Sequence, residues 1–137
     1  MSSDAGYSGT PLPRKLGVKP GHTVLLDNAP ADFALAPLPP DVVVDRAPVA
    51  TDPYDVVLLF CPDATTLHAR WQSDHERTTA AGALWIAWPK KSSKVPTDLD
   101  ENVVRDYGLA HGRVDTKVCA VDATWSGLKF VIRLADR

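Results

Sequence analysis

The sequence lacks the features that mark the commonest nucleic-acid and membrane proteins. Its 15 basic and 17 acidic side chains give a formal net charge of -2, so it has no overall basic field. No apolar run approaches the roughly 20 residues of a membrane-spanning helix. The first residues, Met1 to Gly6, are small and polar and have no apolar signal-peptide core. We therefore expect a cytoplasmic protein with no membrane partner. The charge also argues against nucleic acid as a partner.

Cysteine is scarce, and the usual catalytic and metal-binding motifs are missing. Cys61 and Cys119 each lie in or beside an apolar run, which predicts two buried free thiols. A nucleophilic Cys61 is the alternative. The four histidines show no His-Glu-x-x-His spacing and no Cys-x-x-Cys pair is present, so no metal site is predicted. The sequence also has no Walker loop, no serine–histidine–aspartate pattern and no paired-carboxylate motif.

The chain of 137 residues, 45% of them hydrophobic, fits one α/β domain in which residues 1–13 form an N-terminal arm or loop. Near-continuous apolar runs predict buried parallel strands at 23–27, 42–45, 54–60 and 84–88. Residues 114–121 and 128–134, around a loop at 123–127, predict a C-terminal antiparallel hairpin.

Capping residues and prolines set the expected helices. Residues 31–36 allow a turn or so of helix before the prolines that follow. Asp63 is a suitable N-cap for a helix that runs to about Ala81 and is ended by Gly82. Thr97 is expected to cap a second helix over residues 98–110.

This order of elements resembles a trimmed Rossmann-like sheet of the class I methyltransferase type. Leu16–Asp27 is similar to the lead-in and first strand of that fold, Tyr54–Phe60 to its fourth strand and Gly82–Trp88 to its fifth. The resemblance implies that the strands lie side by side in the order 42–45, 23–27, 54–60, 84–88, 128–134 and 114–121. Residues 46–53 must then cross the first strand as an extended loop, because eight residues reach about 26 Å at roughly 3.3 Å each.

The chain as a whole resembles more closely a family of small bacterial proteins, domain of unknown function 3052. The segments that carry this resemblance are Gly6–Leu12, Trp88–Ser92, Thr97–Leu99, Glu101–Arg105, Val114–Ala120 and Trp125–Lys129. The resemblance implies the fold but no activity.

Ligands of open α/β sheets bind beyond the carboxyl ends of the strands, where the strand order reverses. Four segments are expected to line that crevice: 28–32, 45–48, 61–63 and 89–94. The N-terminal arm is placed to fold over it. The candidate ligand-binding residues are Tyr7, Ser8, Asp27, Asn28, Asp45, Cys61, Asp63, Lys90, Lys91, Ser92, Lys94 and Trp125.

S-adenosylmethionine is the cofactor that the methyltransferase resemblance implies. Asp27 matches the first acidic position of that fold, and Asp45, 18 residues on, has the spacing of the acid that binds the ribose. The Gly-x-Gly step, however, is replaced by Ala29-Pro30-Ala31, which narrows the approach to the backbone and removes an N–H donor. We therefore expect no bound S-adenosylmethionine, which favours a protein that is not an enzyme but leaves the question open.

Lys90, Lys91 and Lys94 are the one concentrated basic feature. They are either a clamp for a small anion or a solvated loop, and Trp125 is either a packed hairpin residue or part of a binding face. The sequence therefore favours a non-catalytic or degenerate methyltransferase-like module that binds a small anionic ligand or a protein partner at the carboxyl edge. The alternatives are an atypical transferase with a nucleotide-type cofactor and weak nucleic-acid binding through Lys90–Lys94.

Overall fold

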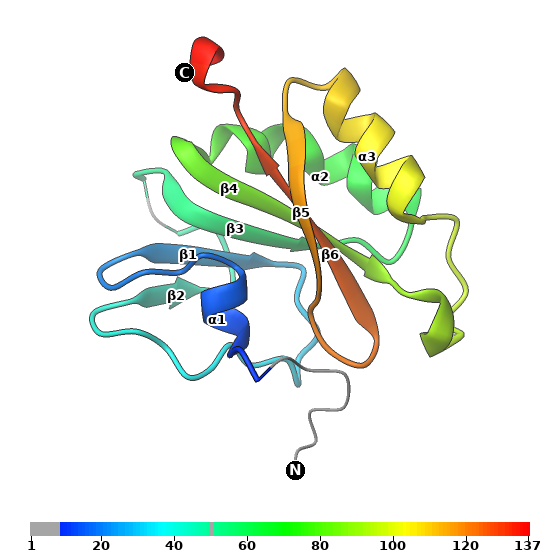
Figure 1. The fold of residues 1–137 in the computed structure, drawn as a ribbon, viewed down its shortest axis with the longest axis horizontal. Coiled ribbons are helices and arrows are strands. Elements are labelled where there is room, and N and C mark those ends of the chain that lie inside the picture. Colours follow the sequence, from blue (N-terminus) through cyan, green and yellow to red (C-terminus); the bar gives the residue numbers. More distant parts are fainter. Residues whose placement is uncertain (1–8, 50) are drawn as a thin grey trace.

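A six-stranded sheet runs through the protein and carries helices on both faces (Figure 1). The computed structural model describes residues 9–49 and 51–137. The strands are β1 (Thr23–Asp27), β2 (Val43–Asp45), β3 (Tyr54–Phe60), β4 (Thr78–Pro89), β5 (Val114–Ala120) and β6 (Trp125–Val131). The helices are α1 (Leu12–Lys15), α2 (Ala64–Glu76) and α3 (Glu101–Ala110), with short 3₁₀ turns η1 (Lys91–Ser93) and η2 (Leu134–Asp136).

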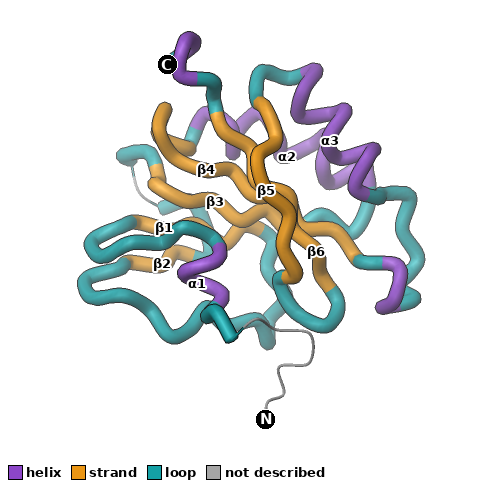
Figure 2. Tube along the Cα trace, in the orientation of Figure 1, coloured by secondary structure: helices purple, strands orange, loops and turns teal. Residues whose placement is uncertain are grey.

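The strand order is β2-β1-β3-β4-β6-β5, as the sequence predicts. The four strands β2, β1, β3 and β4 are parallel, and β6 pairs antiparallel with both β4 and β5. Residues 46–49 and 51–53 contain no helix, so the predicted loop crossing is confirmed. The connection from β1 to β2 is also a loop (Figure 2).

Successive strand residues pack into two separate cores, one on each face of the sheet. The core that includes Leu25 and Leu59 lies under α2 and α3. The core that includes Leu26 and Leu58 lies under α1 and the segment of residues 28–40. The alternation follows from the period of two in strand side chains, and it explains why consecutive residues in the middle of these strands are apolar.

Helix α2 ends earlier than predicted. It stops at Glu76 rather than near Ala81, and residues 78–83 belong to β4. The Thr78 hydroxyl donates to the Asp74 carbonyl at 2.7 Å, and Thr78 pairs with Tyr54 of β3. Gly82 therefore lies inside a strand, where a Cβ would stand 2.5 Å from the Asp55 carbonyl oxygen. Strand pairing with β3 takes precedence here over local helix propensity.

The other boundaries differ by a few residues. Helix α3 begins at Glu101 because Asp100, not Thr97, accepts the capping hydrogen bond, from the Val103 N–H at 2.9 Å. Leu12 is already helical, so the arm predicted over residues 1–13 includes the start of α1. The helical turn predicted over residues 31–36 does not form. Phe33 and Leu35 are instead buried in the core beneath this segment.

The C-terminal hairpin is shifted towards its turn. Strand β6 covers Trp125–Val131 rather than residues 128–134, so the hairpin loop is shorter than predicted. The Asp122 carboxylate accepts from the N–H groups of Thr124 and Trp125 at 2.8 and 2.9 Å, which closes the turn before Trp125. No helix in residues 9–49 or 51–137 combines the length and apolar composition that a bilayer crossing requires.

Candidate functional site

The carboxyl ends of β1, β3 and β4 meet at one edge of the sheet, where β2 and β3 lie on opposite sides of β1. Asn28 follows β1 in the left-handed backbone region, with φ of 60°. Its side-chain amide donates to the Phe60 carbonyl at 3.0 Å, across the gap between the ends of β1 and β3. Asparagine tolerates this conformation better than most residues. The predicted crevice is therefore bridged by a side chain of the chain itself.

Asp27 at the end of β1 is buried, with 5% of its surface exposed. Arg70 of α2 donates to Asp27 at 2.8 Å. The carboxyl of Asp74, which is fully buried, reaches Asp27 from the next turn of the same helix. Burial, the hydrogen bond to Asp27 and the charge of Asp27 raise the pKa of Asp74 to about 8, and Arg77 opposes this. The raised pKa therefore favours a protonated Asp74 beside Asp27 at neutral pH.

Sequence reasoning did not single out Asp74. The available signal is its spacing, because Leu67, Trp71 and Asp74 are the buried residues of α2 and recur at helical intervals. A carboxyl in a buried helical stripe needs a polar partner. The identity of that partner, 47 residues away in the chain, depends on the packing of α2 over β1.

Cys61 and Asp63 follow β3 but present no reactive group. Cys61 is fully buried, and burial followed by the charges of Asp74, Asp27 and Asp63 raises the pKa of its thiol far above the ordinary value. A thiolate nucleophile is therefore disfavoured. Asp63 caps α2, since its carboxylate accepts from the N–H and the hydroxyl of Thr66 at 2.9 and 2.8 Å. Both cysteines are free thiols, with Cys61 buried and Cys119 partly so.

Asp45, the residue at the ribose-binding position, is bonded within the protein. It accepts from the Tyr54 hydroxyl at 2.6 Å. The next residue, Arg46, donates to the carbonyls of Phe33 and Pro30 at 2.8 and 2.7 Å, which holds the loop after β1 against the end of β2. Because Asp27 and Asp45 have internal partners and this loop is closed, these residues do not fit S-adenosylmethionine in the pose usual for the fold.

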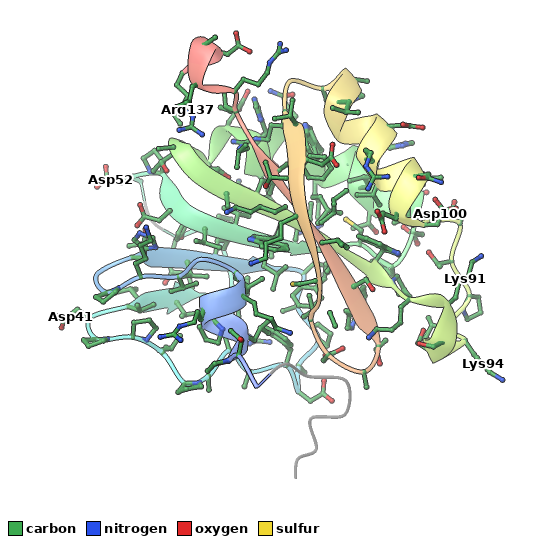
Figure 3. The ribbon with its side chains drawn as sticks, in the orientation of Figure 1. Asp41, Asp52, Lys91, Lys94, Asp100 and Arg137 are labelled. Carbon is green, nitrogen blue, oxygen red and sulfur yellow. The ribbon has the colours of Figure 1, made fainter. Side chains whose placement is uncertain are left out.

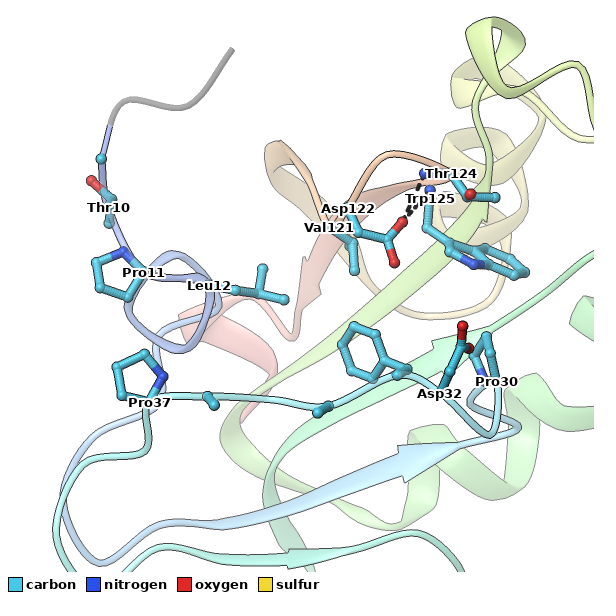
Figure 4. A pocket seen from close by; sticks show the side chains of 14 residues that line it. Thr10, Pro11, Leu12, Pro30, Asp32, Pro37, Val121, Asp122, Thr124 and Trp125 are labelled. Carbon is cyan, nitrogen blue, oxygen red and sulfur yellow. Dashed lines mark hydrogen bonds between the residues drawn. The ribbon is translucent and has the colours of Figure 1, made fainter. Parts of the chain in front are cut away.

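A cavity of about 690 Å³ opens at this edge on the α1 face of the sheet (Figure 4). The indole of Trp125 forms part of its wall and packs edge-on against Phe60, with ring centroids 5.1 Å apart. Phe33 packs against the other side of Phe60 at 4.9 Å. The carboxylates of Asp32 and Asp122 point towards the same space. Trp125 is thus both packed and accessible, in surroundings that disfavour an anion.

The basic residues line a different cleft, of about 400 Å³. Lys90, Lys91 and Lys94 border it, and Lys91 and Lys94 extend outward from the loop after β4 (Figure 3). Ser92 is exposed at the centre of η1. None of the three lysines forms an ion pair within the described ranges 9–49 and 51–137.

The predicted site residues therefore fall into three groups. Asp27, Asn28, Asp45, Cys61 and Asp63 are bonded or buried within the protein, and neither of the two cavities described above is lined by them. Trp125 lines the cavity of about 690 Å³, whereas Lys90, Lys91 and Lys94 line the separate cleft of about 400 Å³. Tyr7 and Ser8 lie outside the described residues. Among the residues that are described, no group of three or more His, Cys, Asp or Glu side chains is placed to hold a metal ion.

Comparison with solved structures defines the class of the fold. A proposed methyltransferase from Thermoplasma acidophilum has a TM-score of 0.52 and 10% identity, and the match covers 85% of this chain and 70% of that one. TrmN from Thermus thermophilus has a TM-score of 0.54 and 13% identity, over 89% of this chain and 47% of that one. This chain therefore spans about half the length of the Thermus protein.

The chain has a trimmed, Rossmann-like α/β fold of the methyltransferase type, as the sequence predicts. Comparison with models of protein families finds no match, and comparison with curated proteins finds none. Identities of 10% and 13% establish the fold alone.

Proposed function

We propose that this chain is a binding module on a methyltransferase-type scaffold, which takes a small anionic ligand at the carboxyl edge of the sheet. The ligand binds in the cleft bordered by Lys90, Lys91 and Lys94, and S-adenosylmethionine has no part in its binding. One observation supports this proposal above the others. Three lysines border a cleft at the edge where such folds bind ligands, and no carboxylate in the described residues neutralises them.

The acids that share the cleft have other partners. Asp98 accepts from the N–H of Ala64, the first residue of α2, at 2.8 Å. Asp100 accepts from the Val103 N–H at 2.9 Å and so caps α3. Carboxylates are favoured at helix N-termini, where the exposed N–H groups stabilise them. These acids therefore serve the two helices and form no ion pair with the lysines, and the three lysines outnumber the two carboxylates that line the cleft.

The loop that carries the lysines is ordered by hydrogen bonds. The Lys90 N–H donates to the Thr124 carbonyl of the hairpin turn at 2.9 Å. The Ser93 N–H and hydroxyl both donate to the Lys90 carbonyl, at 3.0 and 2.6 Å. A loop that is already ordered loses little conformational freedom when it binds, so preorganisation favours affinity. This distinguishes the lysine loop from an unconstrained run of surface charge.

A thermal-shift screen tests the proposal. The chain is heated with inorganic phosphate, nucleotides, S-adenosyl compounds and coenzyme A, because a ligand that binds only the folded state must stabilise it, by about 2.7 kcal/mol at 100 times Kd. We expect an anionic compound to raise Tm, and the Lys90→Ala/Lys91→Ala variant to lose at least tenfold in affinity at unchanged Tm. The control Arg14→Ala/Arg133→Ala removes the same charge elsewhere and should keep the affinity.

Two results would change the proposed function. If the double lysine variant melts far below the wild type and no compound in the screen raises Tm, the lysines are structural and the anion site is wrong. If a nucleotide both stabilises the protein and is consumed, the chain is an atypical transferase. Membership of domain of unknown function 3052 stays a proposal in either case, and it is tested by whether sequences of that family align over the six segments that carry the resemblance.

A further inference from the structure

A second basic cluster lies on the α1 face of the sheet, at the amino ends of the parallel strands. A cavity of about 370 Å³ opens there between the loop after α1, the start of β4 and the end of β6. Its charged and titratable lining residues are Lys19, His22, Asp55, Lys129 and Arg137. This cavity is at the opposite edge of the sheet from the lysine loop, and none of the residues that line that cleft lines this one.

The geometry brings like charges together. Lys129 of β6 is the cross-strand partner of Lys117 of β5, and Lys129 is also close enough to Lys19 to interact with it electrostatically. The Lys129 ammonium lies over Gly17, 4.0 Å from the position that a Cβ would take there. Like charges directly opposite one another on a sheet are destabilising. Burial, and then the charges of Lys117 and Lys19, lower the pKa of Lys129.

No carboxylate in residues 9–49 or 51–137 forms an ion pair with Lys19, Lys117 or Lys129. Asp55, the acid in the cavity lining, accepts from the Thr23 N–H at 2.9 Å and from its hydroxyl at 3.4 Å. The Lys117 ammonium donates to the Lys15 carbonyl at 3.5 Å, a contact that leaves its charge uncompensated.

The remaining polar groups of this cavity are also held in place. His22 Nδ1 accepts from the Lys19 N–H at 3.1 Å, and the Arg137 guanidinium donates to the Ile132 carbonyl at 2.8 Å. Neither contact supplies a negative charge. The lining thus holds one acidic side chain, Asp55, against the three basic side chains of Lys19, Lys129 and Arg137, and an anion would balance the excess of positive charge.

We propose that this cavity binds the phosphate group of a small phosphorylated molecule between the ammonium groups of Lys19 and Lys129, which both line it. Phosphate offers several acceptor oxygens to these two donors, and lysine binds it as a point charge. The volume of about 370 Å³ is near the lower limit of small-molecule sites, so it fits a phosphorylated metabolite better than a dinucleotide. This site is separate from the one in the proposed function, and each can be tested without the other.

The test is an NMR titration of the ¹⁵N-labelled chain with pyrophosphate. We expect saturable shifts at the amides of Gly17, Gly82 and Lys129, which surround the cavity. Lys129→Gln, which keeps most of the side-chain stem but removes the charge, should weaken binding at least tenfold. Because it also relieves the repulsion, its Tm in phosphate-free, low-salt buffer should equal or exceed that of the wild type.

The Lys90→Ala/Lys91→Ala variant serves as the matched control, and it should bind pyrophosphate at the cavity with wild-type affinity. Shifts confined to residues 90–97, or shifts that spread over all lysines without saturation, would overturn the proposal. So would a Lys129→Gln variant that binds as tightly as the wild type. If no anion binds at the Lys90–Lys94 loop, these expectations do not change, because the cleft at that loop shares no lining residue with this cavity.

Discussion

The protonated Asp74 beside Asp27 makes the stability of the fold depend on pH in a way that one substitution can remove. Asp74 is fully buried, and its pKa is raised to about 8. In the unfolded chain an aspartate has a pKa of about 3.9, so between these values the folded state binds one proton more than the unfolded state. The stability that this group contributes is complete below pH 3.9 and is lost as the pH rises through about 8.

The expected magnitude follows from that proton. With a folded-state pKa of about 8, raising the pH from 6 to 8 lowers the free energy of unfolding by about 2 kcal/mol. In Asp74→Asn the side-chain amide donates to Asp27 at every pH, and its oxygen still accepts from Arg77, which stands at 3.1 Å in the wild type. The free energy of unfolding of the variant should therefore not show this decrease of about 2 kcal/mol. It should change by less than about 1 kcal/mol between the two pH values.

Urea unfolding at pH 6 and pH 8, at matched ionic strength, measures the effect. The wild type should lose about 2 kcal/mol more than Asp74→Asn between the two pH values. Burial and then the charge of Arg113 lower the pKa of His75, but His75 is present in both proteins and its contribution cancels in the difference. Asp106→Asn, at an exposed position on α3, should behave as the wild type. Parallel losses in the wild type and Asp74→Asn would show that the proton is not on Asp74.

Three further predictions test the packing, the cap and the cofactor site. Gly108→Ala should lose about 1–3 kcal/mol in urea unfolding, since the added Cβ overlaps the buried Phe130 ring, whereas Leu109→Ala, at an exposed position, should lose under about 0.5 kcal/mol. Equal losses in both would contradict the packing. Asp63→Ala should lose about 1 kcal/mol by the same measurement and Asp63→Ser clearly less, because serine keeps the cap of α2. Calorimetry with S-adenosylmethionine should show no low-micromolar binding, and such binding would refute this expectation and favour an enzyme.

The strand order is the part of this fold that sequence reasoning predicted best. Residues 56–60 are all apolar, which indicates a strand covered on both faces, and the structure places them at the centre of the sheet in β3. The length of residues 46–53 limits their path to an extended crossing without a helix. Both inferences depend on properties of short segments, namely side-chain polarity and reach, and these do not change when the rest of the chain folds.

Element ends were harder to predict, because they depend on distant partners. The threonines and alanines of residues 78–81 suit either a helix or a strand by local preference. Pairing of Thr78 with Tyr54 makes them part of β4. For α3, Thr97 and Asp100 are both acceptable caps. The structure uses Asp100, which directly follows the buried Leu99. Such choices depend on packing energies that no short window of sequence contains.

The sequence by itself determined the class of fold, the edge of the sheet at which ligands of such folds bind, and the residues that lie near that edge. Only the tertiary structure decided which of them are available. Asp27 is paired with Arg70 and lies beside Asp74, and Asp45 accepts a hydrogen bond from Tyr54, whereas the lysines on the loop after β4 form no ion pair in the described residues. The physical reason is that polarity and periodicity are local properties. The pairing of two side chains from distant segments exists only once packing brings those segments together.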